Sequence, residues 1–106
     1  MATFIATMTY ELDPSTEPDA RKLLRAELVG RKWEDRCQGE RMPSHTVWCR
    51  RGAGERSTCD DVHAECGRDL HDAVAAVAKT GRTIALVRAW VQVSGAGTYG
   101  PVPIAR

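Results

Sequence analysis

The hydrophobic pattern of this chain switches between a period of two residues and a period of about 3.6, and the order of these switches restricts the fold. Residues 3–12 alternate like a strand, and a helical segment follows them. Two short strand-like runs come next, at 31–37 and 45–51. A longer helical segment covers about 60–79, and the run 83–94 is again strand-prone. The pattern therefore predicts the element order β-α-β-β-α-β.

Two of these segments carry the pattern most clearly. The first strand places apolar side chains on one side and mostly Thr and Glu on the other, the apolar set being Phe4, Ala6, Met8, Tyr10 and Leu12. The second helix has an apolar stripe at helical spacing: Val62, Cys66, Leu70, Ala73, Val74 and Val77. With right-handed connections, this element order predicts a ferredoxin-like α+β fold. We expect a four-stranded antiparallel sheet in the order 4-1-3-2, with two helices on one face.

Local signals set the expected ends of the helices. Thr16 with Asp19 three residues later is typical of a capping box, and Gly30 is a suitable end for the first helix. Ser57 or Thr58 can cap the second helix, which Lys79 and Gly81 would close.

The length of 106 residues fits a single domain that buries a core without metal or disulfide bonds. We assign that domain to residues 1–94, and residues 95–106 to a C-terminal arm rich in Gly and Pro. The chain has no apolar run long enough to span a bilayer, and its start has no basic region typical of a signal peptide. We therefore expect a cytoplasmic protein that does not associate with membranes and whose four cysteines are free thiols.

Charge is distributed unevenly although the net charge is only +1. Residues 31–56 carry seven basic side chains against four acidic ones, whereas the helical segment 57–72 carries five acids against one Arg. Arg50 and Arg51 close the strand-like run 45–51 and are the candidate contacts to nucleic-acid phosphates. Solvated surface charge is the simpler interpretation of the same pattern.

The last strand-like run is apolar on both alternating sets of positions. Ile84, Leu86 and Trp90 make up one set, and Val87, Ala89, Val91 and Val93 the other. A sheet with helices on one face only would leave part of this run uncovered. We therefore expect a homodimer formed through the sheet, with Trp90 and Val91 in its interface.

The end of the first strand carries the candidate catalytic and metal-binding residues. Glu11 and Asp13 are two residues apart, so an extended strand would project both carboxylates to one face, where they could hold Mg²⁺. Zinc is a weaker alternative. Cys59, His63 and Cys66 share one side of a helix, but Cys66 is also needed as a core residue.

The first strand ending in Tyr10 and an acid, the helix sequence at 19–24 and the run at 45–51 together resemble the Cas2 and VapD-type group of small ferredoxin-like proteins. The resemblance implies a homodimer and, for some members, a metal-dependent or toxin-like ribonuclease. It would put Asp13, or Glu11, in the place of the family's acidic residue. The chain departs from the family pattern by having Glu11 after Tyr10 and by a long connection at 51–59.

Three functions remain open, and with them the question of whether the chain is an enzyme. The first is a dimeric interaction module without a cofactor that binds another protein or a nucleic acid through its sheet face or edge. The second is a Cas2-like nuclease that uses Mg²⁺. The third is a domain that binds a small molecule between sheet and helices, near Trp33, Trp48 and Trp90.

Overall fold

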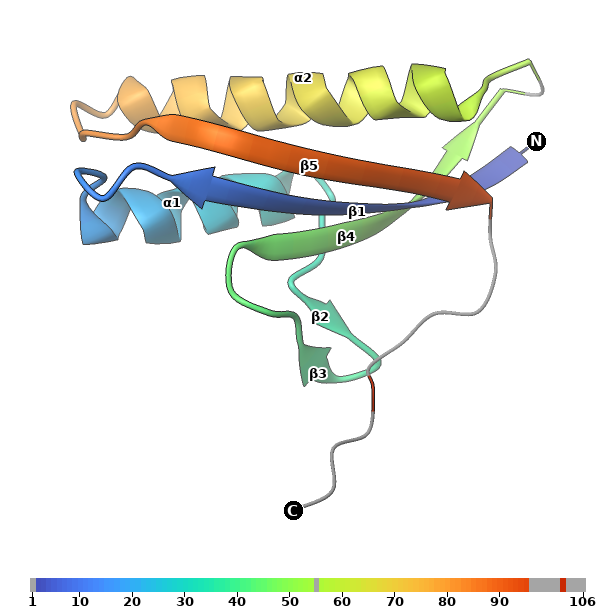
Figure 1. Cartoon of the computed structure of the whole chain (residues 1–106), viewed down its shortest axis with the longest axis horizontal. Helices are drawn as coiled ribbons and strands as arrows, with labels where there is room; N and C mark the ends of the chain where they lie inside the picture. The colour runs from blue at the N-terminus through green and yellow to red at the C-terminus, as the bar shows by residue number, and fades with distance from the viewer. Residues whose placement is uncertain (1, 55, 96–101, 103–106) are drawn as a thin grey trace.

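The computed structural model describes residues 2–54, 56–95 and 102, which form an α+β domain around one antiparallel sheet (Figure 1). Strand β1 (Ala2–Leu12) lies in the centre. Strand β4 (Thr46–Ala53) pairs with one edge of β1, and strand β5 (Leu86–Gly95) pairs with the other. The predicted antiparallel pairing of the last strand with the first is confirmed.

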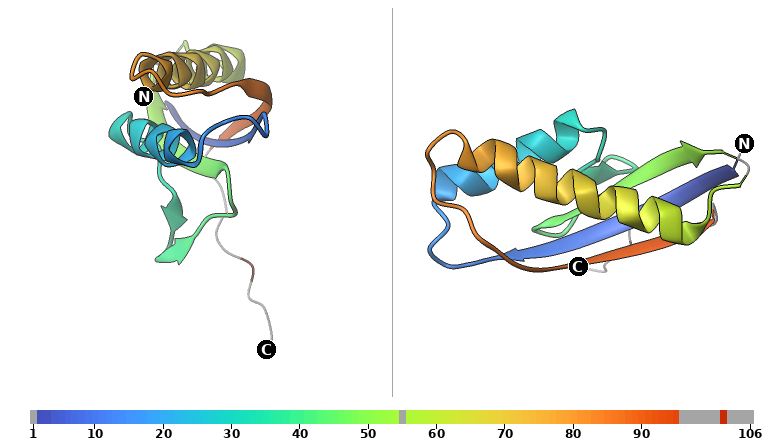
Figure 2. Two further views of the ribbon diagram at one scale, coloured as in Figure 1. Left: turned by 90° about the vertical axis from the view of Figure 1, so that its left-hand side faces the viewer. Right: turned by 90° about the horizontal axis from the view of Figure 1, so that it is seen from above.

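Two helices cover one face of this sheet, as the end-on view in Figure 2 shows. They are α1 (Pro18–Gly30) and α2 (Cys59–Ala78). All five apolar residues of the alternating set in β1 are buried beneath them, together with the stripe predicted for α2, in which only Val74 is partly exposed. The hydrophobic core therefore lies between the helices and the even-numbered side chains of β1, as the two periodicities predict.

The strand predicted at residues 31–37, which would have formed an edge of the sheet, differs most from expectation. Residues 31–37 contact the sheet through one bridge, in which Glu34 and Trp48 exchange two backbone hydrogen bonds of 2.7 and 3.0 Å. The chain then turns into a separate hairpin of β2 (Arg36–Cys37) and β3 (Glu40–Arg41). The main sheet consequently has three strands, because Gln38 and Gly39 both adopt positive φ and reverse the chain before a fourth strand can extend. The ferredoxin-like assignment stays a prediction.

A β-bulge explains why the last strand reads as apolar on both sides. Glu11 pairs with Arg88, but the next residue, Leu12, pairs with Leu86, so Val87 is an extra residue in β5. The bulge shifts Leu86 onto the helix-covered face, where Val91 and Val93 also lie. Most apolar side chains of β5 thus share one face, and the expectation that this strand needs cover on both faces loses its main support.

The helix ends agree with the sequence signals in α2 but not in α1. Thr58 and Asp61 form a capping box, and Lys79 caps the other end of α2. In α1 the N-cap is Glu17, because the Thr16 hydroxyl instead accepts a hydrogen bond from the backbone of Ala85. The first helix also continues through Gly30 instead of ending there, and Arg31 is its C-cap.

Most of the predicted C-terminal arm at 95–106 lies outside the described residues. Within the described part of the chain, neither helix combines the length and the apolar character that a membrane span requires.

Candidate functional site

The face of the sheet opposite the helices is the candidate site. Direct cross-strand pairs define its rows, because paired residues of antiparallel strands point to the same side. From one end to the other, the three-strand rows are Ser94–Ile5–Arg50, Gln92–Thr7–Trp48 and Trp90–Thr9–Thr46, followed by the pair Arg88–Glu11. We call these side chains the open face. On the central strand, Thr7 and Thr9 carry hydroxyl groups, with the buried Ile5 on one side of them and Glu11 on the other, and the two outer strands carry large side chains.

Two tryptophans lie on the open face, on opposite sides of β1. Trp90 on β5 is 70% exposed, although a side chain of this size is normally well buried. Trp48 on β4 is half-buried, and its indole Nε1 donates a 2.7 Å hydrogen bond to the carbonyl oxygen of Arg36. The hairpin that replaces the fourth strand therefore fixes the orientation of the Trp48 ring.

Between the tryptophans, the face is polar. The hydroxyls of Thr9 and Thr46 lie 3.4 Å apart across neighbouring strands. Glu11 forms a 2.8 Å ion pair with Arg88, and both side chains are more than half exposed. This pair offsets the carboxylate on the open face, while Arg50 is exposed and adds a positive charge.

Arg51 lies on the helix-covered face of the sheet, although the sequence analysis predicts that Arg50 and Arg51 both contact phosphates. Its guanidinium contacts Asp69 of α2 at 2.7 Å and lies over the Trp33 ring, 5.5 Å from the ring centroid. The same Asp69 oxygen accepts a 3.0 Å hydrogen bond from the Trp33 indole. Hydrogen bonding to Asp69 raises the pKa of Arg51 against the opposing effect of burial. Arg51 therefore links β4 to α2 through its ion pair with Asp69. Of the two arginines, Arg50 is the one that points to the open face.

The buried thiols next to Arg51 also interact. Cys49 and Cys66 are both free and lie in the core. A hydrogen bond from the Cys66 thiol lowers the pKa of Cys49 to about 7, and the nearby positive charge of Arg51 acts in the same direction. The same hydrogen bond and burial raise the pKa of Cys66.

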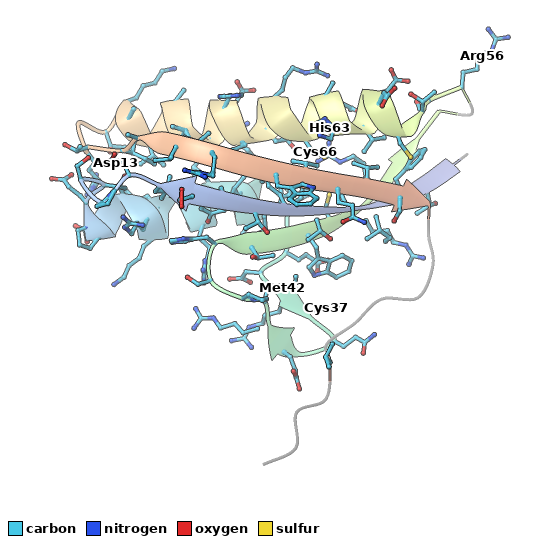
Figure 3. All side chains as sticks on the ribbon, viewed as in Figure 1. Asp13, Cys37, Met42, Arg56, His63 and Cys66 are labelled. Carbon is cyan, nitrogen blue, oxygen red and sulfur yellow. The ribbon has the colours of Figure 1, made fainter. Side chains whose placement is uncertain are left out.

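Glu11 and Asp13 are engaged by different groups. Glu11 is at the end of β1 and is engaged by Arg88. Asp13 lies in the turn that follows, at the edge of the molecule seen in Figure 3, where its carboxylate accepts a 2.9 Å hydrogen bond from the backbone of Ser15. Hydrogen bonding from the Ser15 side chain, and then from its backbone, lowers the pKa of Asp13. The turn takes Asp13 out of the strand, so the alternation that would align the two carboxylates does not extend to it.

The cysteines and histidines considered for zinc are scattered. Figure 3 shows Cys37 on the hairpin, beyond the β4 edge of the sheet and away from His63 and Cys66 of α2. Cys66 is buried in the core, whereas Cys59 and His63 are exposed. Among the described residues, no group of three or more His, Cys, Asp or Glu side chains is placed to hold a metal ion.

The remaining predicted residues also separate between the two faces. Val91, predicted with Trp90 as a dimer contact, is partly buried against the core, while Trp90 is on the open face. Trp33 is buried on the helix side, so the three tryptophans do not line one pocket. A shallow groove of about 510 Å³ lies instead between the start of α1 and the turn after α2, lined by Glu17, Pro18, Asp19, Thr80, Gly81 and Arg82.

No protein family model, no curated protein and no solved structure matches this chain. The resemblance to the Cas2 and VapD-type group stays a prediction.

Sequence reasoning identified Arg50 and Trp90 but missed the threonine rows and the anchoring of Trp48. The alternation in β1 already placed Thr3, Thr7 and Thr9 on one side of the strand. That signal could have defined the polar centre of the face. The anchoring of Trp48 could not be read, because its partner is a backbone carbonyl on a hairpin that the sequence pattern did not reveal.

Proposed function

We propose that this protein is a non-enzymatic binding module whose open face binds single-stranded nucleic acid. The observation that carries the proposal is the exposed Trp90 ring, which lies across the central strand from Trp48 on the open face. Exposed aromatic rings on a sheet are suited to stack on unpaired bases, which have apolar faces and polar edges.

The surroundings of the two rings support the same ligand. Hydroxyl groups of Thr7, Thr9 and Thr46 lie in the rows of the two rings and can donate to or accept from base edges and sugar oxygens. Arg50 lies one row beyond Trp48 on the same strand face and can contact a phosphate. The carboxylate of Glu11 is offset by Arg88, so the face does not repel a polyanion.

Binding without cleavage agrees best with the positions of the acidic residues. Glu11 and Asp13 are each engaged by another group, and they come from a strand end and a turn. A nuclease that uses them stays a prediction with its own test. Any phosphodiesterase activity should require Mg²⁺ or Mn²⁺ and should be lost in the Glu11→Ala, Asp13→Ala double variant.

The proposal is tested by titrating fluorescently labelled single-stranded RNA and DNA of about ten nucleotides, a length suited to a single small sheet. Fluorescence anisotropy at low salt gives the affinity. Replacing Trp90 with Ala should weaken binding by about tenfold or more, since stacking on an aromatic ring contributes about 1–3 kcal/mol per base. Circular dichroism should show an unchanged melting temperature, because Trp90 is mostly exposed.

Val87→Ala is the matched control. Val87 is another exposed apolar residue of β5, but it lies at the bulge and outside the rows of the open face. This variant should bind as well as the wild type. Equal binding by wild type and Trp90→Ala, or no retention of RNA or DNA at low salt, would overturn the proposal.

A second copy of the chain is the other candidate occupant of the open face, as the sequence predicts. The 70% exposure of Trp90 favours this candidate too, because burying an indole ring is a common source of interface energy. Analytical ultracentrifugation separates the two. A dimer at tens of micromolar that becomes monomeric in Trp90→Asp, without nucleic-acid binding, would support self-association, whereas a monomer that binds nucleic acid would support the first proposal.

A further inference from the structure

A second polar cluster lies on the opposite side of the sheet from Trp90, where β1, α1 and the start of β4 meet. Tyr10 points toward the helices and is 3% exposed, and its hydroxyl is buried without a well-aligned hydrogen bond. An unpaired hydroxyl in a protein interior is costly, so its presence calls for a physical explanation. The side chains around it suggest one.

The neighbours of the Tyr10 hydroxyl are basic. The His45 ring stacks on the Tyr10 ring, with 5.3 Å between centroids. Arg25 of α1 lies beside the phenol, where its positive charge and the approach of its N–H groups to the hydroxyl oppose the rise in the Tyr10 pKa that burial causes. Arg21 is one helical turn before Arg25 on the same side of α1, and both are half-buried.

The other contacts of the cluster leave donors for a ligand. Arg21 uses one Nη2 group to donate a 3.1 Å hydrogen bond to the carbonyl oxygen of Asp13, and a guanidinium has five N–H groups. Burial, together with the charges of Arg21 and Arg25, lowers the pKa of His45. Burial is the larger cause of this shift, and an anion bound beside the two arginines would oppose the part that their charges contribute.

We propose that Tyr10, His45, Arg21 and Arg25 form a binding site for a phosphoryl group. Two guanidinium groups, an imidazole and a phenol supply more converging donors than a carboxylate can accept, and a phosphate offers three or four oxygens. The Tyr10 hydroxyl gains the hydrogen bond that it lacks. Admitting the ligand requires the half-buried side chains of Arg25 and His45 to rotate. The site is independent of the open face.

The test uses inorganic phosphate as the probe, with sodium chloride at equal ionic strength as the reference. Isothermal titration calorimetry and thermal unfolding should show that phosphate binds the wild type and raises its melting temperature. Tyr10→Phe should weaken phosphate binding about tenfold, yet unfold at a higher temperature than the wild type without phosphate, because the unpaired hydroxyl is gone. A role limited to packing would not produce these opposite changes.

Arg25→Gln and Lys22→Gln form a matched pair, since both remove one positive charge from α1, but Lys22 is exposed to solvent. Arg25→Gln should lose phosphate binding, and Lys22→Gln should retain it. The proposal is overturned if phosphate has no effect beyond that of chloride, or if Tyr10→Phe or Arg25→Gln binds phosphate as tightly as the wild type.

The source of the phosphoryl group is distinguished with two oligonucleotides of one sequence, with and without a 5′-phosphate, tested in the Trp90→Ala protein. A gain in affinity from the 5′-phosphate that disappears in Tyr10→Phe assigns the site to nucleic-acid ends. Equal affinity of both oligonucleotides, with phosphate binding intact, assigns it to a small phosphorylated ligand.

Discussion

The two faces of the sheet are built from the same three strands but differ in burial and polarity. On the helix side, the residues of β1 are apolar and buried, and the polar groups of Arg51, Asp69 and Trp33 satisfy one another. On the open side, threonines occupy the centre, and Trp90 remains exposed. The fold requires the first arrangement and not the second. The chemistry of the open face is therefore free to serve binding, and this contrast can be tested.

The largest difference in stability is expected between variants of two neighbouring residues of β1 that point to opposite faces. Met8 is fully buried, so Met8→Ala should lower the free energy of unfolding by about 2–5 kcal/mol. Thr9 is exposed, and Thr9→Ala should lower it by less than about 1 kcal/mol. Urea denaturation measures both. Similar losses for the two variants would mean that the open face is covered in solution, as in a sheet-to-sheet dimer.

A smaller effect on stability is expected from the hydrogen bonds of Asp69, which link α2 to Arg51 of β4 and to Trp33. Asp69→Ala removes the acceptor of both Arg51 and Trp33, and should lower the free energy of unfolding by about 2 kcal/mol because two part-buried donors lose their partner. Asp72→Ala, an exposed change of the same kind on α2, should be nearly neutral. Equal stability of the two variants would show that these hydrogen bonds do not tie α2 to β4.

Arg50 and Arg51 sharpen the comparison further, because they are adjacent residues on opposite faces. Arg50→Gln should leave stability unchanged and reduce the slope of log affinity for single-stranded nucleic acid against log salt by about 0.7. Arg51→Gln should do the reverse, with lower stability and an unchanged slope, since its guanidinium is held by Asp69. A slope that responds to Arg51 and not to Arg50 would contradict the assignment of the faces.

The smallest effect concerns pH. The pKa of His45 is lowered in the folded protein, so below its ordinary value of about 6.5 the unfolded chain binds the proton more readily. Stability should therefore fall as pH decreases through this range. His45→Asn keeps a residue that tolerates the positive φ of 59° and should show a shallower fall in urea denaturation between about pH 7.5 and 5.5. An identical dependence of stability on pH in the wild type and in His45→Asn would show that His45 is not part of the cluster with Arg21 and Arg25.

Much of the fold follows from short-range pattern, whereas the candidate sites do not. The stripe of α2 and the alternation of β1 each predict a buried face, and the Thr58 capping box is visible as a local motif. The prediction of Trp90 with Val91 in one interface, and of Arg50 with Arg51 as joint phosphate contacts, each combines adjacent residues of one strand. Alternation places Arg50 and Arg51 on opposite faces, and the bulge at Val87 resets the alternation within β5.

The sequence by itself determined the order of elements, the buried side of β1 and α2, and the polar side of the central strand, because each depends on the periodicity of a single segment. Only the tertiary structure decided that 31–37 would leave the sheet after one bridge, and that Glu11 would form an ion pair with Arg88. It also brought Tyr10 next to Arg25 and His45. These contacts join segments far apart in the chain, and their geometry depends on turns, a bulge and packing that no single segment encodes.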